Sequence, residues 1–599
     1  NTLYVTSLNG GAAKDSISLN ALTKDRTNRN WFGLSGTAFV SKENYTLRMQ
    51  DSLILNYEKW RVAPDNYIAY GPAGIIVNNF VISSDTAKID VRSKQIVADS
   101  PIDIAIKNFN LKSISSIVSK DTVFLAGILD MNATVSDLKK ALPSFTGNAS
   151  VRDVQFMQHP LGTITATAQK QSENNISATL NLKGADNDMT AAGNYYLNST
   201  TEQFDADLQV KALSFKTLEA FSANQLINSR GNISGNLKLN GKFANPQYNG
   251  QLNFDTVKFT LAKLGTPYFI DKQKIISQYP QTQFPEFVIT DSLKNALKVN
   301  GNISSHGIMD YDLGIKLNAN NFIVVNAKKT LNNEIYGFAS VNVNVDVTGT
   351  SARPVIEGDI LLNDKSDVKI VLPQTSYEKN DGKTIVRFVD VDTFKIDPPQ
   401  AGFEPALKPA SAFAQFLNYN LNIELSKEAA LTILIDPSTG DEIKVQGDAR
   451  LNAGVDPGGN LVLAGVYELD KGYYDLHYGI LQRKFNLIKG STITFAGAPL
   501  EASANITAEY TALTSSKDLL SNEVTDVSPT LANSFNQKLP FRVILYLTGS
   551  LRKPNISFDI QLPEESSLLN GDLRTTIENK LLQIRNDPAT VNKEVFSLL

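Results

Sequence analysis

Residues 311–318 read YDLGIKLN, and every second side chain of this octapeptide is apolar. Successive side chains of a β-strand point to opposite faces of a sheet, so this spacing predicts a strand with one buried face and one wet face. The apolar members of the octapeptide are Tyr311, Leu313, Ile315 and Leu317.

The same two-residue period returns along the chain. Its clearest recurrences are Ile176, Ala178, Leu180 and Leu182, and then Val341, Val343, Val345 and Val347. Further strands are expected at 204–212, 461–469 and 541–548. The clusters GADND (184–188), NG (300–301) and DPGGN (456–460) have the composition of tight turns between antiparallel strands. The sequence therefore predicts a mostly β protein.

Helical spacing is rare. Apolar residues three and four apart predict short helices at 109–118 and 213–227, and a longer helical stretch at 566–599 that breaks at Pro588. Its stripe of Ile577, Leu581 and Ile584 is expected to pack against the end of the sheet rather than to bind a partner. Irregular surface loops are expected at 373–383, 397–410 and 514–538.

Composition excludes several classes of protein. The 599 residues carry 57 basic and 61 acidic side chains, a net charge of −4, which disfavours nucleic acid as the main partner. Cysteine is absent, which excludes disulfide scaffolds, thiolate metal sites and thiol nucleophiles. No run of 18 apolar residues offers a membrane span.

Both ends of the chain have unusual compositions for natural termini. The sequence begins at Asn1 without Met or a signal-like segment, in what is expected to be a strand. It ends in the apolar run Val595, Phe596, Leu598 and Leu599. We expect an internal piece of a longer protein, with any targeting or anchoring segment outside it.

A repeat of about 100 residues organises the middle of the chain. Residues 109–163 align with 213–266 at an offset of 104 and then 103, which superposes Pro143 on Pro246 and Gly127 on Gly231. GKFANP (241–246), GTSARP (349–354) and GSLRKP (549–554) share Gly-x4-Pro, so Pro143, Pro246, Pro354 and Pro554 are expected near strand ends. The predicted segments are 1–107, 108–208, 209–311, 312–420 and 421–599.

An antiparallel sheet with one apolar face must cover that face. Too few helices are predicted to cover hundreds of residues of sheet, which leaves a two-sheet sandwich or a sheet curled into an elongated, solenoid-like trough. An empty apolar trough is unfavourable by about 25 cal/mol per Å² in water, so a trough would need acyl chains or another apolar guest.

A resemblance to a known family favours the trough. Residues 447–499 contain a Gly-led strand, a hairpin of the form G-x-Y-x-[LI]-x-x-G-x-Y and a closing strand that ends in an aromatic residue, Gly and Pro. The matching positions are Gly465, Tyr467, Gly472, Tyr474, Gly490, Phe495, Gly497 and Pro499. This order resembles the C-terminal domain of the TamB family, whose later strand pair and helix are similar to 543–559 and 592–599. The polar stretch 514–538 is longer than in the family pattern, and the family's terminal strands after the helix are missing.

The resemblance implies a β-taco with a hydrophobic groove in the periplasm of a diderm bacterium, held at the inner membrane by an anchor upstream of Asn1. It also implies work with an outer-membrane barrel of the BamA/TamA class, in phospholipid movement between the membranes, in assembly of outer-membrane proteins, or in both. The expected ligands are phospholipid acyl chains. No cofactor, metal site or enzymatic activity is expected.

The sequence offers no clear combination of catalytic residues. The histidines His159, His306 and His477 lack a second ligand or nucleophile nearby in sequence. Asp186 and Asp188 lack the rest of a calcium loop, so a hairpin is favoured there. The carboxylates Asp390, Asp392 and Asp397 show no second acidic group to form a glycosidase pair.

Two alternatives to a lipid groove stay open, a surface or adhesive β-solenoid and a carbohydrate-active β enzyme. The enzyme would need aromatic platforms beside paired acids, and the only tryptophans are Trp31 and Trp60. The residues expected to line the groove are Ile176, Ala178, Leu180, Leu182, Tyr311, Leu313, Ile315, Leu317, Val341, Val343, Val345, Val347, Phe541, Val543 and Leu545.

Overall fold

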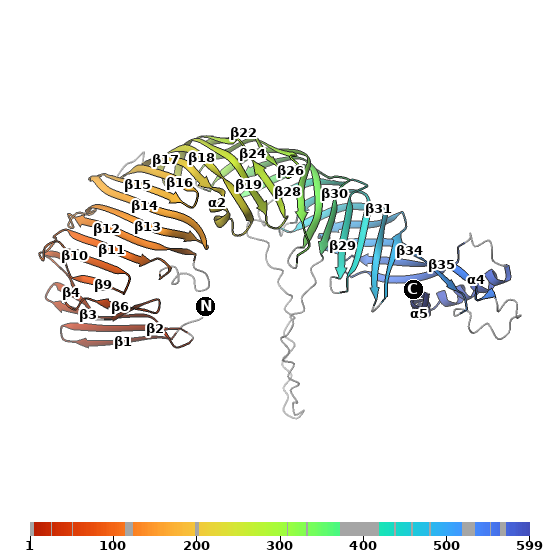
Figure 1. Cartoon of the computed structure of the whole chain (residues 1–599), viewed down its shortest axis with the longest axis horizontal. Coiled ribbons are helices and arrows are strands. Elements are labelled where there is room, and N and C mark those ends of the chain that lie inside the picture. Colours follow the sequence, from red (N-terminus) through yellow and green to blue (C-terminus); the bar gives the residue numbers. More distant parts are fainter. Residues whose placement is uncertain are drawn as a thin grey trace, which may run out of the picture. The chain divides into compact units, whose positions relative to one another are not determined.

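The computed structural model describes residues 5–25, 27–50, 52–113, 124–197, 203–307, 309–330, 334–371, 418–436, 439–456, 459–478, 481–517, 534–551, 553–563 and 571–598. These described residues contain 36 strands and three α-helices, which confirms the predicted mostly β fold (Figure 1). The chain divides into two compact units. Unit 1 comprises Asn1–Ala262, Tyr268–Val288 and Asn302–Tyr311, and unit 2 comprises Lys263–Pro267, Ile289–Gly301 and Asp312–Leu599.

Strands β1 to β19 lie wholly in unit 1. Their bounds are β1 Val5–Ala13, β2 Ser16–Lys24, β3 Asn30–Ser41, β4 Asn44–Met49, β5 Ser52–Leu55, β6 Glu58–Val62, β7 Tyr67–Gly71, β8 Gly74–Asn78, β9 Phe80–Ser83, β10 Lys88–Ser93, β11 Ile102–Asn110, β12 Leu125–Ser136, β13 Ser144–Phe156, β14 His159–Ser172, β15 Asn175–Gly184, β16 Asn187–Tyr196, β17 Phe204–Ser214, β18 Leu226–Lys242 and β19 Asn245–Leu261. Helix α2 spans Phe215–Phe221.

The remaining strands follow in chain order. Their bounds are β20 Thr266–Ile270, β21 Gln273–Gln278, β22 Gln281–Thr290, β23 Ala296–Ser305, β24 Tyr311–Ala327, β25 Ile335–Thr350, β26 Arg353–Leu362, β27 Asp367–Val371, β28 Asn418–Leu425, β29 Ala430–Asp436, β30 Asp441–Val455, β31 Leu461–Tyr478, β32 Leu481–Leu487, β33 Ser491–Gly497, β34 Ser503–Ser515, β35 Lys538–Ser550 and β36 Asn555–Gln561. A 3₁₀ turn spans Pro499–Glu501, and helices α4 and α5 span Gly571–Arg585 and Pro588–Leu598.

The strands predicted from alternation all form. Residues 311–318 lie in β24, 341–348 in β25, 176–183 in β15 and 204–212 in β17, while 461–469 and 541–548 lie in β31 and β35. The β15–β16 hairpin closes with Ala185 and Asp186, both of positive φ. Two such residues make the type of turn whose twist matches a hairpin, so the GADND cluster is a turn as expected.

The turn predicted at Asn300-Gly301 is wrong, because this pair lies inside β23. A Cβ added at Gly301 would stand 2.0 Å from the carbonyl oxygen of Gly314. Gly301, at φ +121, therefore permits the close approach of a neighbouring strand. The local sequence does not show that a glycine is needed here for this reason.

Among the described strands pairing is antiparallel almost throughout, with two exceptions in unit 2. Strand β26 pairs parallel with β28, and β27 pairs parallel with β29. The expectation of antiparallel neighbours therefore fails at this one place. The predicted loops at 373–383 and 397–410 lie outside the described residues, as do Asp390, Asp392 and Asp397.

Prolines of the predicted repeat lie where strands begin. Pro143 and Pro554 come directly before β13 and β36, and Pro246 and Pro354 are second residues of β19 and β26. A proline lacks the N–H that a central strand needs, which accounts for these positions.

The predicted helices form in part. Residues 109–110 belong to β11, and α2 is shorter than the predicted 213–227 because residues on both sides of it join β17 and β18. The break at Pro588 is confirmed, since α4 ends at Arg585 and Pro588 begins α5. Asp587 precedes α5 and accepts a 3.1 Å hydrogen bond from the amide of Ala589.

The two units differ in how their apolar residues are covered. Unit 1 has a small core in which Trp60, 2% exposed, packs with Phe109 at a ring-centroid distance of 5.9 Å. Unit 2 has a large closed core near its C-terminal end, where the stripe of Ile577, Leu581 and Ile584 packs against strands β30 to β36. The packing expected for this stripe is therefore confirmed.

Candidate functional site

One face of the unit 1 sheet is apolar across many strands. Strands β11 to β19 pair in sequence order, and their register aligns the apolar sets of successive strands. One row of directly paired residues, which we call the central row, runs through Met131, Ala149, Ala166, Leu180, Ala191, Leu208 and Leu237. Side chains paired in this way share a face, so the row crosses the strands on one side of the sheet, here called the apolar face.

A second row on the apolar face consists almost wholly of small residues. It runs through Ala133, Gly147, Ala168, Ala178, Gly193 and Ala206, and ends at Leu239. At roughly 4.8 Å between strands, the seven strands β12 to β18 extend the row over about 29 Å. Small side chains leave the surface lower here than at the leucines of the central row.

The opposite face of the same strands is polar. Asn181 of β15 donates from Nδ2 to Thr165 Oγ1 of β14 at 3.4 Å, and its Oδ1 accepts from Thr190 Oγ1 of β16 at 2.8 Å. These bonds join neighbours along the sheet, so polar side chains on this face satisfy one another or meet water. The apolar side is consequently the one that lacks a solvent-compatible surface.

The described residues of unit 1 leave part of its apolar face uncovered. Leu180 on β15 is 48% exposed, and Leu8, Leu19 and Leu34 on the paired strands β1 to β3 are 67%, 44% and 45% exposed. A hollow of about 610 Å³ over β17 to β19 is lined by Leu208, Leu237, Gly250 and adjacent polar residues. Unit 1 thus presents apolar side chains that its described residues do not bury.

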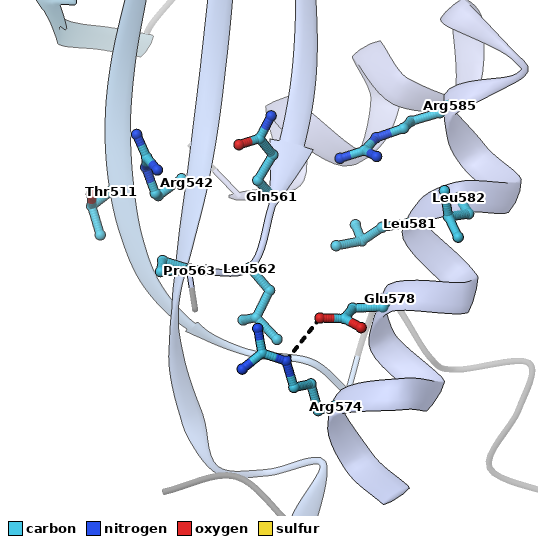
Figure 2. A pocket seen from close by; sticks show the side chains of 10 residues that line it. All are labelled: Thr511, Arg542, Gln561, Leu562, Pro563, Arg574, Glu578, Leu581, Leu582 and Arg585. Atoms are coloured by element: carbon cyan, nitrogen blue, oxygen red, sulfur yellow. Dashed lines mark hydrogen bonds and ion pairs between the residues drawn. The ribbon is translucent and has the colours of Figure 1, made fainter. Parts of the chain in front are cut away.

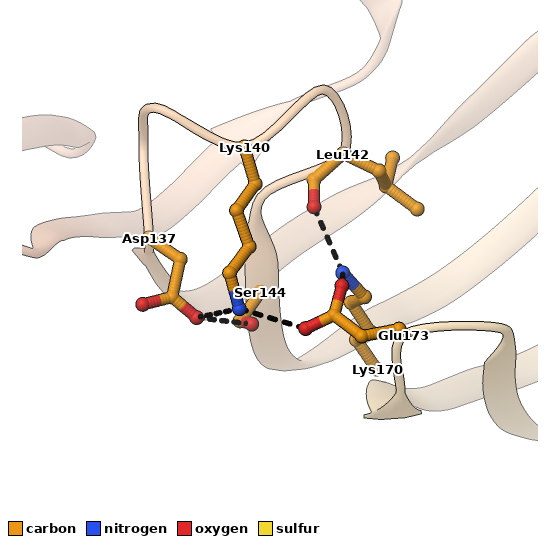
Figure 3. A network of polar contacts seen from close by, with 6 residues as sticks. All are labelled: Asp137, Lys140, Leu142, Ser144, Lys170 and Glu173. Carbon is orange, nitrogen blue, oxygen red and sulfur yellow. Dashed lines mark hydrogen bonds and ion pairs between the residues drawn. The ribbon is translucent and has the colours of Figure 1, made fainter.

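Figure 3 shows a charged network at the end of β14. Lys170, whose side chain is 3% exposed, pairs across the strands with Ile176 and so ends an apolar row. Its Nζ donates to the carbonyl oxygen of Leu142 and to Glu173 Oε2, each at 2.9 Å. Lys140 Nζ donates to the other oxygen of Glu173 at 2.7 Å. The network joins the residues after β12 to the β14–β15 turn.

Two acids of this network have perturbed ionisation. The hydrogen bond from Lys140 holds the pKa of Glu173 below its usual 4.5. The hydrogen bond from Ser144, 2.7 Å from Asp137 Oδ2, holds the pKa of Asp137 below its usual 3.8. Both carboxylates therefore remain charged at neutral pH and form a polar border to the apolar face.

The predicted groove residues of unit 1 share the apolar face, as alternation requires. Ile176 and Leu182 are half-buried, and Ala178 and Leu180 are exposed. The sequence prediction did not include the partners Ala166, Ala168 and Leu208 on neighbouring strands. Alternation in ITATA (164–168) was a usable signal for the first two, but only the register shows that they adjoin Leu180 and Ala178.

Apart from Tyr311, which belongs to unit 1, the predicted residues of β24 and β25 come together in unit 2. Ile315 pairs with Val347 and Leu317 with Val345. Tyr311, Leu313, Val343 and Val347 are half-buried like Ile315 and Leu317, whereas Val341 and Val345 are only 6% and 5% exposed.

Phe541, Val543 and Leu545 differ from the open groove lining predicted for them. Each is 0% exposed within the core that includes residues of α4 and α5. Alternation placed these three on the apolar side of β35, but the helices cover that side, and so we do not propose them as an open surface.

The family-like motif of β31 has structural roles. Tyr467 and Tyr474 are each 1% exposed in the unit 2 core, and burial raises the pKa of both phenols. Gly472 has φ +151, and a Cβ there would stand 2.1 Å from the carbonyl oxygen of Lys444 on β30. The spacing of tyrosines and glycines in this motif therefore reflects the packing of strands rather than ligand chemistry.

Other candidate chemical sites do not assemble. Within the described residues, no group of three His, Asp or Glu side chains could hold a metal ion. His159 begins β14, His306 follows β23, and His477 of β31 lies 3.6 Å from Asp441 through Nδ1. Among the described helices, none is long and apolar enough to span a bilayer.

Comparison with known families accounts for most of the chain. The TamB C-terminal domain matches residues 285–599, and the TamB N-terminal domain matches residues 92–254. No curated protein and no solved structure matches the chain. The two domains follow one another in order, and the first match alone covers more than half of the 599 residues, so the chain belongs to TamB, a family of cell-envelope proteins.

Proposed function

We propose that this chain binds phospholipid acyl chains on the apolar face of unit 1 and moves phospholipids between the inner and outer membranes. The observation that carries the proposal is the uncovered apolar face, with Leu180 and the leucines of β1 to β3 roughly half exposed or more. Apolar surface is unfavourable in water by about 25 cal/mol per Å². An acyl chain laid along the rows would remove this penalty and gain about 0.8 kcal/mol for each buried CH₂ group.

Dimensions agree with this ligand. The hydrocarbon core of a bilayer is about 30 Å thick, so one acyl chain extends about 15 Å. The row of small residues extends over about 29 Å in unit 1, which is close to two such lengths end to end. The row of small residues forms a shallow path across the strands, and a carried lipid would move in this direction.

The family supports the setting of this function. TamB proteins are envelope-associated, are not known as enzymes, and in general have an outer-membrane assembly partner. For this chain we propose a location in the periplasm of a diderm bacterium, an inner-membrane anchor outside the sequence, and a barrel partner of the BamA/TamA class. Assembly of outer-membrane proteins with that barrel is the second part of the proposal.

Site-specific crosslinking tests the lipid-binding part. A photoreactive amino acid at Leu208, on the apolar face, should crosslink to phospholipid in cells, because an acyl chain would lie against it. The same group at Gln209, on the opposite face of β17, is the matched control. Lipid extraction and native mass spectrometry of the purified chain would identify the bound species. Equal labelling at both positions, or purified chain without lipid, contradicts the proposal.

The alternatives predict other results. An adhesive β-solenoid would carry no lipid and would bind surfaces or cells. A carbohydrate-active enzyme would bind or cleave glycans, and Trp60, one of its two possible tryptophan platforms, is buried in the unit 1 core.

A further inference from the structure

A cavity of about 830 Å³ lies at the C-terminal end of unit 2, between the sheet and helix α4 (Figure 2). Arg542 of β35 and Gln561 of β36 line one side, and Arg574 and Arg585 of α4 line the other. Its volume falls in the range of about 300 to 1,000 Å³ that small-molecule sites occupy. All residues that line the cavity belong to unit 2, whereas the apolar face belongs to unit 1.

Two of the arginines keep hydrogen-bond donors unused. Arg542 donates through Nε to Glu509 Oε2 at 2.9 Å, and Arg585 donates through Nε to Asp559 Oδ1 at 2.8 Å. In both guanidinium groups, Nη1 has no hydrogen-bond partner among the described residues. A guanidinium group can donate hydrogen bonds to an anion through the edge that carries Nη1 while its Nε edge stays paired with a carboxylate.

The charges of the site are balanced. The third arginine, Arg574, donates through Nε to Glu578 Oε1 at 2.8 Å. Each arginine is thus matched by a carboxylate, and an anion would be held by directed donors rather than by a strong positive field. The ion pair of Arg585 has side chains 40% and 17% exposed, and pairs with that access to water contribute little energy, so an anion can compete with them.

The cavity also has an apolar part. Leu562 and Leu581 line it from opposite sides, and Leu582 beside them is 56% exposed (Figure 2). Gln561 adds an amide between the strands and the guanidinium of Arg585. Guanidinium donors and leucine side chains in one cavity suit an amphiphile with an anionic head and an apolar chain better than they suit a free ion.

We propose that this cavity binds the phosphate group of an anionic phospholipid. Arg542 and Arg585 hydrogen-bond the phosphate oxygens through their unused edges, and Leu562 and Leu581 contact the first carbons of the acyl chains. The inference rests on the proposed lipid function, because that function supplies the ligand, and it adds a site that recognises the head group.

Calorimetric titration of the purified whole chain tests the site. The probes are dihexanoyl phosphatidylglycerol, dihexanoyl phosphatidylcholine, glycerol phosphate and inorganic phosphate. We expect the phosphatidylglycerol to bind at least tenfold more tightly than the other three probes. Equal affinity for inorganic phosphate would assign the cavity to a free anion, and equal affinity for phosphatidylcholine would remove the preference for an anionic head. Either result overturns the proposal.

Variants locate the binding. The double variant Arg542→Gln with Arg585→Gln should weaken phosphatidylglycerol binding at least tenfold, and Arg585→Lys, which keeps the charge but loses the planar fork, should weaken it severalfold. Arg450→Gln removes a unit 2 arginine that is 82% exposed and should change nothing. If the double variant unfolds, Arg585→Lys decides the question. Unchanged affinity for phosphatidylglycerol in the folded variants would refute the inference.

The outcome separates this inference from the proposed function. Crosslinking of lipid at Leu208 together with no head-group binding in the cavity would refute the inference and leave the proposed function intact. Loss of crosslinking at Leu208 would refute the proposed function whatever the calorimetry shows.

Discussion

Placing a charge on the apolar face should stop lipid binding without unfolding the chain. Leu180 is suited to this change because its side chain is 48% exposed and lies in the central row of unit 1. Full burial of a leucine is worth about 2 kcal/mol, so loss of its half-buried side chain in Leu180→Asp costs about 1 kcal/mol of stability. Folded protein should therefore persist.

The effect on the ligand is larger. A carboxylate beside an acyl chain loses part of its hydration, and a penalty of about 3 kcal/mol weakens binding about a hundredfold. Movement of lipid along the rows should fail altogether, because every molecule must pass this point. The control is Thr179→Asp, which places the same charge on the polar face one residue away.

Three measurements complete the test. Circular dichroism and protein abundance establish that both variants fold, lipid extraction measures bound phospholipid, and outer-membrane permeability to a large antibiotic reports function in cells that lack other family members. Folded Leu180→Asp protein that binds lipid and complements as well as Thr179→Asp would refute the conduit. A role as a scaffold for barrel assembly would then be the better account.

Three further outcomes are expected. Val343→Asp on β25 should reduce lipid transfer while Asn344→Asp, exposed on the other face, should not, and equal transfer by the two folded variants would contradict a functional apolar face in unit 2. Tyr467→Phe should raise the free energy of unfolding by about 1 kcal/mol in a denaturant titration, because the buried Tyr467 hydroxyl has no hydrogen-bond partner among the described residues; a destabilised variant would show that the hydroxyl is satisfied. Folding holds the pKa of Glu173 below its unfolded value, so the stabilising contacts of Glu173 are present above its usual 4.5 and are lost as pH falls through the lowered pKa. The amide protection factors of the 137–144 segment, which correct for the intrinsic pH dependence of hydrogen exchange, should fall in that acid range, whereas those of Glu173→Gln should stay constant across it; unchanged protection factors in the native chain would contradict this.

Strands were predictable where the signal is local. Alternation in 176–183 and 311–318 specifies both a strand and the side chains that share a face, because a two-residue period has no other simple cause. The same logic could not tell what covers a face. Leu180 is exposed and Leu545 is fully buried, although both are apolar members of alternating strands, since helices α4 and α5 return to cover β35.

Features that depend on distant partners escaped prediction. Gly301 was expected in a turn, because its close contact with Gly314 on another strand cannot be seen in the local sequence. The arginine cavity joins Arg542 to Arg585, which are 43 positions apart in the sequence and meet only through packing of β35, β36 and α4. No spacing rule links such residues in a single sequence.

Strand pairing in unit 1 has a consequence for how the chain reaches its fold. From β10 to β19 each strand hydrogen-bonds with the strand directly before it in sequence, often through turns as short as Ala185-Asp186. Short loops close at little entropic cost, so hairpins can form early and the sheet can extend by one strand at a time. Because each strand contacts mainly its neighbours, an inserted or deleted hairpin pair lengthens or shortens the sheet without altering distant packing. The length of such a sheet can therefore change in evolution by whole hairpins, while the register of every remaining strand is kept.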